Sequence, residues 1–170
     1  MNFILNDSEY VDIVRNILDN DNFKKIDGLV HHRTNRLIHS LRVSYFSYKI
    51  SKVLFLDKRK VARAGLLHDF FLTNSKDKKD RLVSVFKHSK EACDNARYNF
   101  ILSQMEEDII RTHMFPVVPN RVPKYAESWV VSLVDKGVSL YEFVNNYGNM
   151  CTLKLKNALV LLVLFLGRMI

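Results

Sequence analysis

The prolines of this chain are confined to one short segment, and this confinement constrains the possible folds more than any other feature. Pro116, Pro119 and Pro123 are the only prolines, and the 170 residues include only 5 glycines. Proline interrupts helices, whereas turn-rich β proteins need many prolines and glycines. We therefore expect residues 115–124 to form a rigid loop and helices to run without interruption elsewhere.

Apolar residues recur at helical spacing along almost all of the chain, and no segment is predicted to be a strand. We predict an all-α fold, a compact single-domain bundle of about seven helices over residues 1–170. Asp7 or Ser8 is expected to cap the first helix, and Ser103 with Glu106 has the spacing of a capping box. The predicted helices span about residues 8–20, 34–55, 58–72, 89–100, 103–113, 125–144 and 152–170.

A histidine and an aspartate lie side by side in an apolar run. The run from Ala64 to Leu72 reads AGLLHDFFL and is expected to be buried. A buried carboxylate is unfavourable unless its charge is compensated, and a metal ion bound by Asp69 and His68 would compensate it. Gly65 stands one turn before His68, where the missing side chain would let a neighbouring helix approach closely.

Further potential metal ligands lie on or beside apolar segments elsewhere in the chain: His39, His88, His113 and Asp135. Asp135 is the most informative of them, because its helical neighbours at positions 131, 134 and 138 are all valines. A carboxylate on such a core-facing stripe requires a metal or a salt bridge, for which Arg42 or Arg63 could serve. Each histidine alone is more simply explained as a hydrogen-bonded core residue, so the metal hypothesis depends on the whole set.

The order His39, His68-Asp69, Asp135 on a helical chain resembles the HD superfamily of metal-dependent phosphohydrolases. The surrounding sequences are similar as well: HSLRV at residues 39–43, ARAGLLHD at residues 62–69 and VDK at residues 134–136. The resemblance covers about residues 31–145, which would hold the metal site. It implies that one divalent metal is bound by His39, His68, Asp69 and Asp135, and that a second is held with the help of His88 and His113.

The resemblance also implies a reaction. We expect a metal-activated water to hydrolyse a phosphate monoester or a nucleotide-derived phosphoanhydride. Asp69 would ligate the metal and orient this water, and Arg42 and Lys136 would neutralise the phosphate oxygens of the substrate. The pair His31-His32 is either a surface pair or, through His32, a further phosphate contact.

The implied ligands are nitrogen and oxygen donors without a thiolate, which suits one or two ions of iron, manganese, zinc, cobalt or nickel. Their order also looks like that of dinucleoside polyphosphate hydrolases and cyclic-dinucleotide phosphodiesterases. The latter carry a lysine three residues after the aspartate of the His-Asp pair, where this chain has Leu72. This difference counts against cyclic-dinucleotide cleavage. The alternative from another functional class is a helical module that binds a metal and a nucleotide without turnover.

The formal net charge of +8 suits a small phosphorylated substrate such as a nucleotide, but it serves solubility equally well. No recognised nucleic-acid-binding motif is present in the sequence, so no nucleic-acid partner is expected. The N-terminus does not resemble a signal peptide, which predicts a cytoplasmic protein. The apolar run at residues 158–166 is shorter than the roughly 20 residues of a membrane span. We expect a buried terminal helix there, with a homodimer or membrane-surface contact as the alternative.

Overall fold

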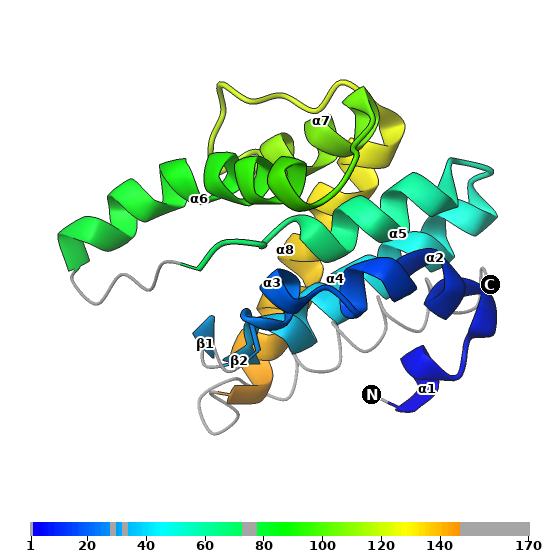
Figure 1. Ribbon diagram of the computed structural model, residues 1–170. Coiled ribbons are helices and arrows are strands. Elements are labelled where there is room, and N and C mark those ends of the chain that lie inside the picture. Colours follow the sequence, from blue (N-terminus) through cyan, green and yellow to red (C-terminus); the bar gives the residue numbers. More distant parts are fainter. Residues whose placement is uncertain (1, 28–29, 32–33, 73–77, 147–170) are drawn as a thin grey trace.

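The computed structural model describes residues 2–27, 30–31, 34–72 and 78–146. These residues form eight α-helices and one antiparallel ladder of two short strands (Figure 1). The fold is all-α, as predicted, although the sequence pattern does not indicate the ladder. The predicted helix at 152–170 and His32 lie outside the described residues. The elements are α1 (Asn2–Leu5), α2 (Ser8–Leu18), α3 (Asp21–Lys24), β1 (Val30–His31), β2 (Thr34–Asn35), α4 (Arg36–Val53), α5 (Lys58–Leu67), α6 (Lys78–Asn99), α7 (Gln104–Thr112) and α8 (Ala126–Asn146).

Polar side chains mark the start of the helices. Asp7 caps α2, and its Oδ1 accepts a hydrogen bond from the backbone N–H of Tyr10 (3.2 Å). At α7, Ser103 and Glu106 form the predicted capping box. The N–H of Glu106 donates to Ser103 Oγ (3.3 Å), and the N–H of Ser103 donates to Glu106 Oε2 (2.7 Å). Each cap satisfies a backbone donor that has no acceptor within its own helix.

Two helix ends differ from the predicted ones. α5 ends at Leu67, earlier than predicted, because the N–H of Phe70 donates back to the Leu67 carbonyl (3.1 Å) and closes a turn. His68 and Asp69 therefore lie in this turn and not within the helix. α6 begins at Lys78, well before the predicted start, since a lysine-rich sequence does not exclude a helix when lysine itself has a high helix propensity.

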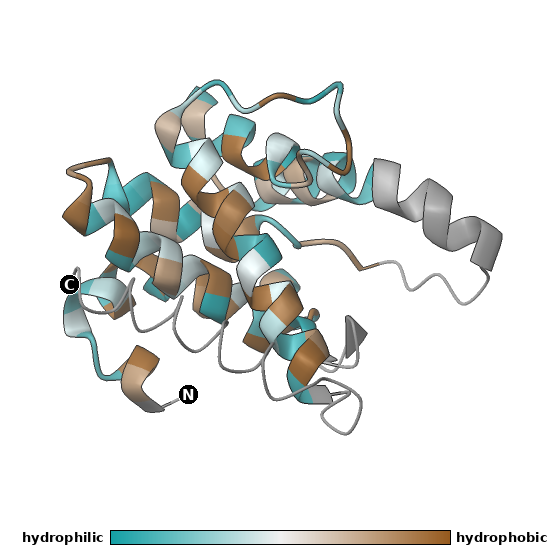
Figure 2. Ribbon diagram, turned by 180° about the vertical axis from the view of Figure 1, so that it is seen from behind, coloured by the Kyte–Doolittle hydropathy of each residue, from teal (hydrophilic) through white to brown (hydrophobic). Residues whose placement is uncertain are grey.

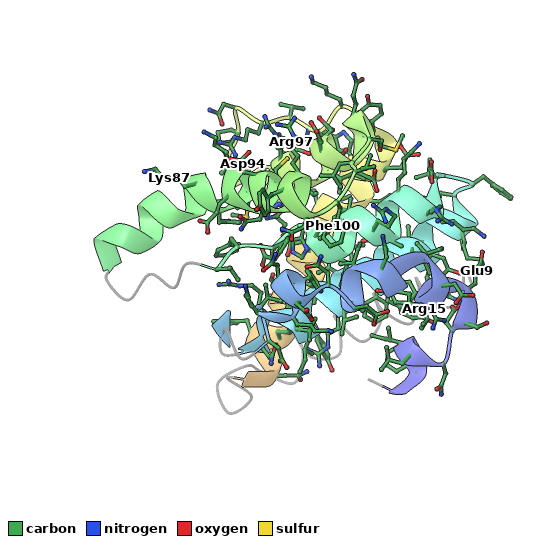
Figure 3. The ribbon with its side chains drawn as sticks, viewed as in Figure 1. Glu9, Arg15, Lys87, Asp94, Arg97 and Phe100 are labelled. Atoms are coloured by element: carbon green, nitrogen blue, oxygen red, sulfur yellow. The ribbon has the colours of Figure 1, made fainter. Side chains whose placement is uncertain are left out.

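α4 packs on both α5 and α8, and α5 also contacts α2, α6, α7 and α8. Figure 1 shows α8 running from the side of α7 at the top to the ladder at the bottom. Hydrophobic and hydrophilic residues are interspersed along the helices (Figure 2), and the largest fully buried side chains include Tyr10, Phe23, Tyr48 and Phe70. Figure 3 labels exposed charged residues at the periphery: Glu9, Arg15, Lys87, Asp94 and Arg97. Within the described ranges, no helix combines the length and the hydrophobicity that crossing a membrane requires.

α4 and α5 approach each other closely because the residues between them are small. Ser40, Ser44, Ser47 and Ser51 recur at helical spacing on α4, and all four are buried. A Cβ atom built on Gly65 of α5 would lie 3.0 Å from the Cα atom of Ser44. The glycine thus permits the close approach that its position in the sequence predicts, and it determines the separation of the two helices.

We expect Gly65→Ala to lower the free energy of unfolding by about 1–3 kcal/mol, because the added methyl group would press on the backbone of α4. Gly137→Ala in α8 is the matched control, since a Cβ atom there meets no described neighbour within 4 Å. Gly137→Ala should raise the free energy of unfolding by about 0.5–1 kcal/mol, because alanine has a higher helix propensity than glycine. Urea-induced unfolding measures both values, and equal effects would contradict the assigned contact.

Candidate metal centre

Six side chains from five parts of the fold form one buried cluster. None of them is more than 6% exposed, and His39 and Asp135 are in contact although 96 positions separate them in the chain. The structure therefore brings together all of the ligands predicted from the sequence. They are His39 from α4, His68 and Asp69 from the turn after α5, His88 from α6, His113 from the end of α7 and Asp135 from α8.

Asp69 lies between two groups of imidazoles. Its Oδ1 is 3.6 Å from His113 Nε2 and 3.8 Å from His88 Nε2, whereas its Oδ2 is 3.8 Å from His68 Nε2. Three overlapping sets of ligand atoms could each hold an ion. These sets are His39–His68–Asp69, His68–His113–Asp135 and Asp69–His88–His113.

Helix ends orient two of the histidines. His68 and His113 are the C-cap residues of α5 and α7. The Nδ1 atom of each lies at hydrogen-bond distance from the carbonyl three residues earlier, that of Gly65 (2.8 Å) or Ile110 (2.7 Å). The last carbonyls of a helix lack an intrahelical donor, and a carbonyl can only accept. Nδ1 therefore carries the proton in both rings, and each Nε2 presents a lone pair to the centre.

His39 also contacts a buried carboxylate, Glu142, which the sequence analysis did not single out. The Nδ1 atom of His39 lies 3.0 Å from Glu142 Oε2, and its Nε2 atom lies 3.1 Å from Asp135 Oδ1. Glu142 is 3% exposed, and its Oε1 accepts a hydrogen bond from Arg42 (2.7 Å). The sequence contains a signal for it, because Glu142 follows Asp135 by two helical turns and therefore lies on the same buried face.

Burial and mutual contacts shift the titration of the ligands. Burial holds the pKa of His113 well below its usual value, and the neighbouring imidazoles of His68 and His88 act in the same direction. Its imidazole is therefore neutral at pH 7, which is the form that binds a metal. Burial acts against ionisation of Asp135, but its contacts with His39 and His68 prevail and hold its pKa well below the usual range. The centre thus contains an ionised carboxylate beside a neutral imidazole.

His39 shows that the centre attracts positive charge. Burial lowers the pKa of His39, but its hydrogen bonds to Asp135 and Glu142 outweigh burial and raise the pKa to about 10. A divalent ion coordinated by Nε2 would supply this charge in place of the proton.

The remaining ligand atoms also fit a divalent cation. The Nε2 atom of His68 is buried and makes no hydrogen bond to any described residue, as expected of an atom that ligates a metal. The Nε2 atoms of His88 and His113 are 3.1 Å apart. Two nitrogens bound at right angles to one ion lie about 3 Å apart, because each metal–nitrogen bond is about 2.1 Å long.

Asp135 is compensated by its neighbours and not by either arginine suggested from the sequence. Lys136 Nζ donates to Asp135 Oδ2 (3.0 Å), and His39 contacts the other oxygen. The alternative of a salt bridge to Arg42 or Arg63 is wrong. Both arginines pair with other carboxylates, those of Glu142 (2.7 Å) and Glu106 (2.8 Å).

A buried arginine that the sequence did not indicate, Arg36, lies beside the centre. Arg36, 2% exposed, is the first residue of α4 and precedes His39 by one turn. Its Nη1 donates to the carbonyl of Phe71, and its guanidinium lies 3.8 Å from the centre of the Phe71 ring. That ring is 5.1 Å from the ring of His88. Arg36 thus ties the segment that follows Asp69 to the start of α4.

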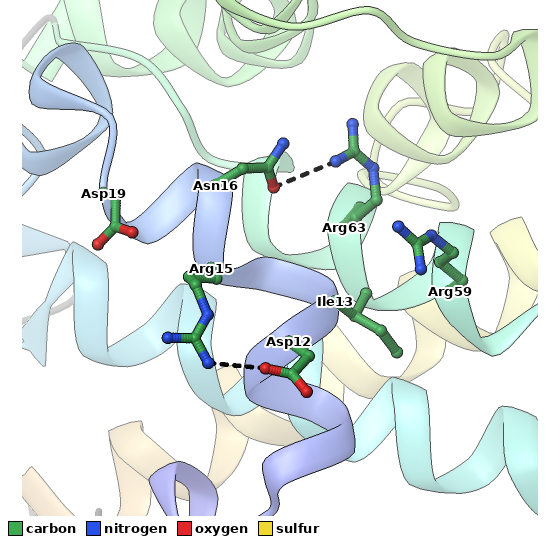
Figure 4. A pocket seen from close by; sticks show the side chains of 7 residues that line it. All are labelled: Asp12, Ile13, Arg15, Asn16, Asp19, Arg59 and Arg63. Carbon is green, nitrogen blue, oxygen red and sulfur yellow. Dashed lines mark hydrogen bonds and ion pairs between the residues drawn. The ribbon is translucent and has the colours of Figure 1, made fainter.

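A surface hollow of about 440 Å³ involves none of the six ligands (Figure 4). Four of its charged residues, Asp12, Arg15, Asp19 and Arg59, are exposed, and Arg15 pairs with Asp12 (2.7 Å). The fifth, Arg63, is half-buried and pairs with Glu106. We therefore assign the functional centre to the buried cluster. The hollow is lined by Asp12, Ile13, Arg15, Asn16, Asp19, Arg59 and Arg63.

Comparison with known proteins relates the chain to a protein family. A family model described as HD domain matches residues 36–137, more than half of the chain. The match begins at the first residue of α4 and ends two residues after Asp135, so it includes all six ligands. No curated protein and no solved structure matches the chain.

Proposed function

The chain belongs to the HD-domain family, and from this premise we propose that it is a metal-dependent phosphohydrolase. Its substrate would be a phosphate monoester or a nucleotide-derived phosphoanhydride, a class that includes the dinucleoside polyphosphates. The centre would hold two divalent ions, with iron, manganese, zinc, cobalt and nickel as the candidates. The single observation that carries this proposal is the position of Asp69, whose two oxygens face different imidazole groups.

The chain's own residues would divide the work of hydrolysis. The bound ions would supply a water of lowered pKa, which is the nucleophile of the reaction. Asp69 would hold and orient this water, because its carboxylate reaches both ligand groups. The histidines would remain neutral ligands, since the Nδ1 protons of His68 and His113 are donated to backbone carbonyls.

Lys136 is the best-supported phosphate contact. Its Nζ donates to Asp135 Oδ2 and to the carbonyl of His113, which leaves one of its three donors, and its side chain is 32% exposed. Arg42 uses one Nη on Glu142, and its side chain is 34% exposed. We propose its remaining N–H groups as a second contact. His32 stays a predicted contact.

A substrate screen tests the proposal. The protein, loaded anaerobically with each candidate metal in turn, is incubated with phosphate monoesters, nucleotides and dinucleoside polyphosphates. Metal-dependent release of phosphate or nucleotide would support hydrolysis. Tight binding of metal and nucleotide without release would favour the non-catalytic module. Binding that ignores metal and falls steeply with salt would indicate an electrostatic binder of nucleic acid.

We expect His113→Ala or His88→Ala to weaken one ion and to spare much of the binding of the other. Either change removes a ligand from the Asp69–His88–His113 set and leaves the His39–His68–Asp69 set complete. Elemental analysis after dialysis should therefore fall from two ions per chain toward one. If either variant lost all of its metal, the division into two sets would be wrong.

A cytoplasmic location, a single domain over residues 1–170 and a homodimer remain proposals. The apolar segment at 152–170 would be the first candidate for the dimer contact, and light scattering of the purified protein measures the oligomeric state.

A further inference from the structure

We propose that Glu142 is a positioning residue that orients His39 for metal binding. Its Oε2 accepts the Nδ1–H of His39 (3.0 Å), which directs Nε2 toward Asp135 (3.1 Å). The inference rests on the proposed metal-dependent function, and it goes beyond it by assigning a role to a residue that is not a ligand.

His39 needs a side-chain acceptor because of its place in α4. His68 and His113 lie at helix ends, where unpaired backbone carbonyls accept their Nδ1 protons. His39 is the fourth residue of an 18-residue helix. The carbonyls around it are used by the helix itself, so its Nδ1 proton must be donated to a group from another element. α8 supplies that group.

A carboxylate at Nδ1 affects metal binding more strongly than a backbone carbonyl would. A negatively charged acceptor at Nδ1 fixes the tautomer and makes the opposite nitrogen a stronger donor to a metal. Glu142 is 3% exposed, and a buried carboxylate requires compensation. Arg42 provides it through the 2.7 Å contact with Oε1. Arg42, Glu142 and His39 therefore form a line of contacts that ends at Asp135.

The variant Glu142→Gln tests the assignment, because glutamine keeps the shape and an acceptor oxygen but removes the charge. We expect its affinity for Zn²⁺ at the His39 position to fall by about 10–100-fold. The affinity of the ion held with His88 and His113 should not change. Titration of the metal-free protein with Zn²⁺ against a chromogenic chelator measures both affinities without any use of activity.

Glu106→Gln is the matched control. Glu106 is also buried, at 5% exposure, and also pairs with an arginine, but it contacts no proposed ligand. The Glu106→Gln protein should bind Zn²⁺ with the affinity of the wild type. An equal loss of Zn²⁺ affinity in Glu106→Gln and in Glu142→Gln would overturn the assignment.

The wild-type protein supplies a readout that does not depend on how a variant folds. Nitrogen chemical shifts of the Zn²⁺-loaded protein should show His39 protonated at Nδ1, and an unprotonated Nδ1 would overturn the proposal. A wild-type protein that takes up no Zn²⁺ would count against the proposed function itself. A wild type that binds Zn²⁺ no better than Glu142→Gln would overturn only the role of Glu142.

Discussion

Replacement of Asp69 by alanine is expected to remove both metal ions and to lower the rate of hydrolysis by about 10³-fold or more. Asp69 is the residue whose oxygens face both the His68 side and the His88–His113 side of the centre. Its loss therefore affects both ligand sets that contain it. Bound metals contribute several kcal/mol to transition-state stabilisation, and each 1.4 kcal/mol or so corresponds to a factor of ten in rate.

The measurement combines elemental analysis with the rate on whichever substrate the screen identifies. Asp69→Asn tests whether charge alone is responsible, because asparagine has nearly the same shape. Asp94→Ala is the control on α6, where the aspartate is exposed and lies outside the ligand sets (Figure 3). It should retain metal and rate. An Asp69→Ala protein that keeps two ions would remove the basis for a bridging carboxylate.

Addition of a transition metal to the metal-free protein is expected to raise the melting temperature by about 5–11 °C. An ion that binds only the folded state at a concentration 100 times its Kd stabilises that state by about 2.7 kcal/mol. For a chain of this length, each kcal/mol corresponds to a shift of about 2–4 °C. The physical reason is that two buried carboxylates and four imidazoles lie together at the centre.

Calorimetry with Zn²⁺, Mn²⁺ and Mg²⁺ measures this shift. Mg²⁺ should have the smallest effect, because it prefers oxygen ligands and retains its water, whereas four of the six ligands here are imidazoles. A chelator should reverse the shift, and Asp69→Ala should show little of it. A similar shift in Asp69→Ala would mean that the stabilising ion binds elsewhere.

The burial of the two aspartates could be predicted because their charges stand in apolar stretches of the sequence. Asp69 stands in an apolar run and Asp135 on a stripe of valines, and the structure buries both. The same reasoning applies to Glu142, two turns after Asp135 on the same face, but the family pattern did not include that position. Arg36 carried no such signal, because an arginine at the start of a helix is more often exposed.

The α4–α5 interface was harder to predict than the apolar core. Serine is a polar residue in a hydrophobicity pattern, yet Ser40, Ser44, Ser47 and Ser51 form one buried side of α4. Their small side chains allow α5 to approach α4 closely, and this role can be recognised only once Gly65 is known to face Ser44. The early end of α5 depended on the turn at Leu67 and Phe70, which hydrophobic spacing does not encode.

By itself, the sequence determined the helical class and most helix starts, and it predicted the six side chains that the structure brings together. The helices and the two carboxylates follow from local rules, since helical spacing, capping residues and a charge in an apolar run can each be read within one segment. The complete set of six was implied by the resemblance to the HD superfamily. Only the tertiary structure decided that Glu142 contacts His39, that Arg42 pairs with Glu142 and that Asp69 faces two imidazole groups. Such contacts join side chains far apart in the chain, and they depend on how deeply and at what angle the helices pack.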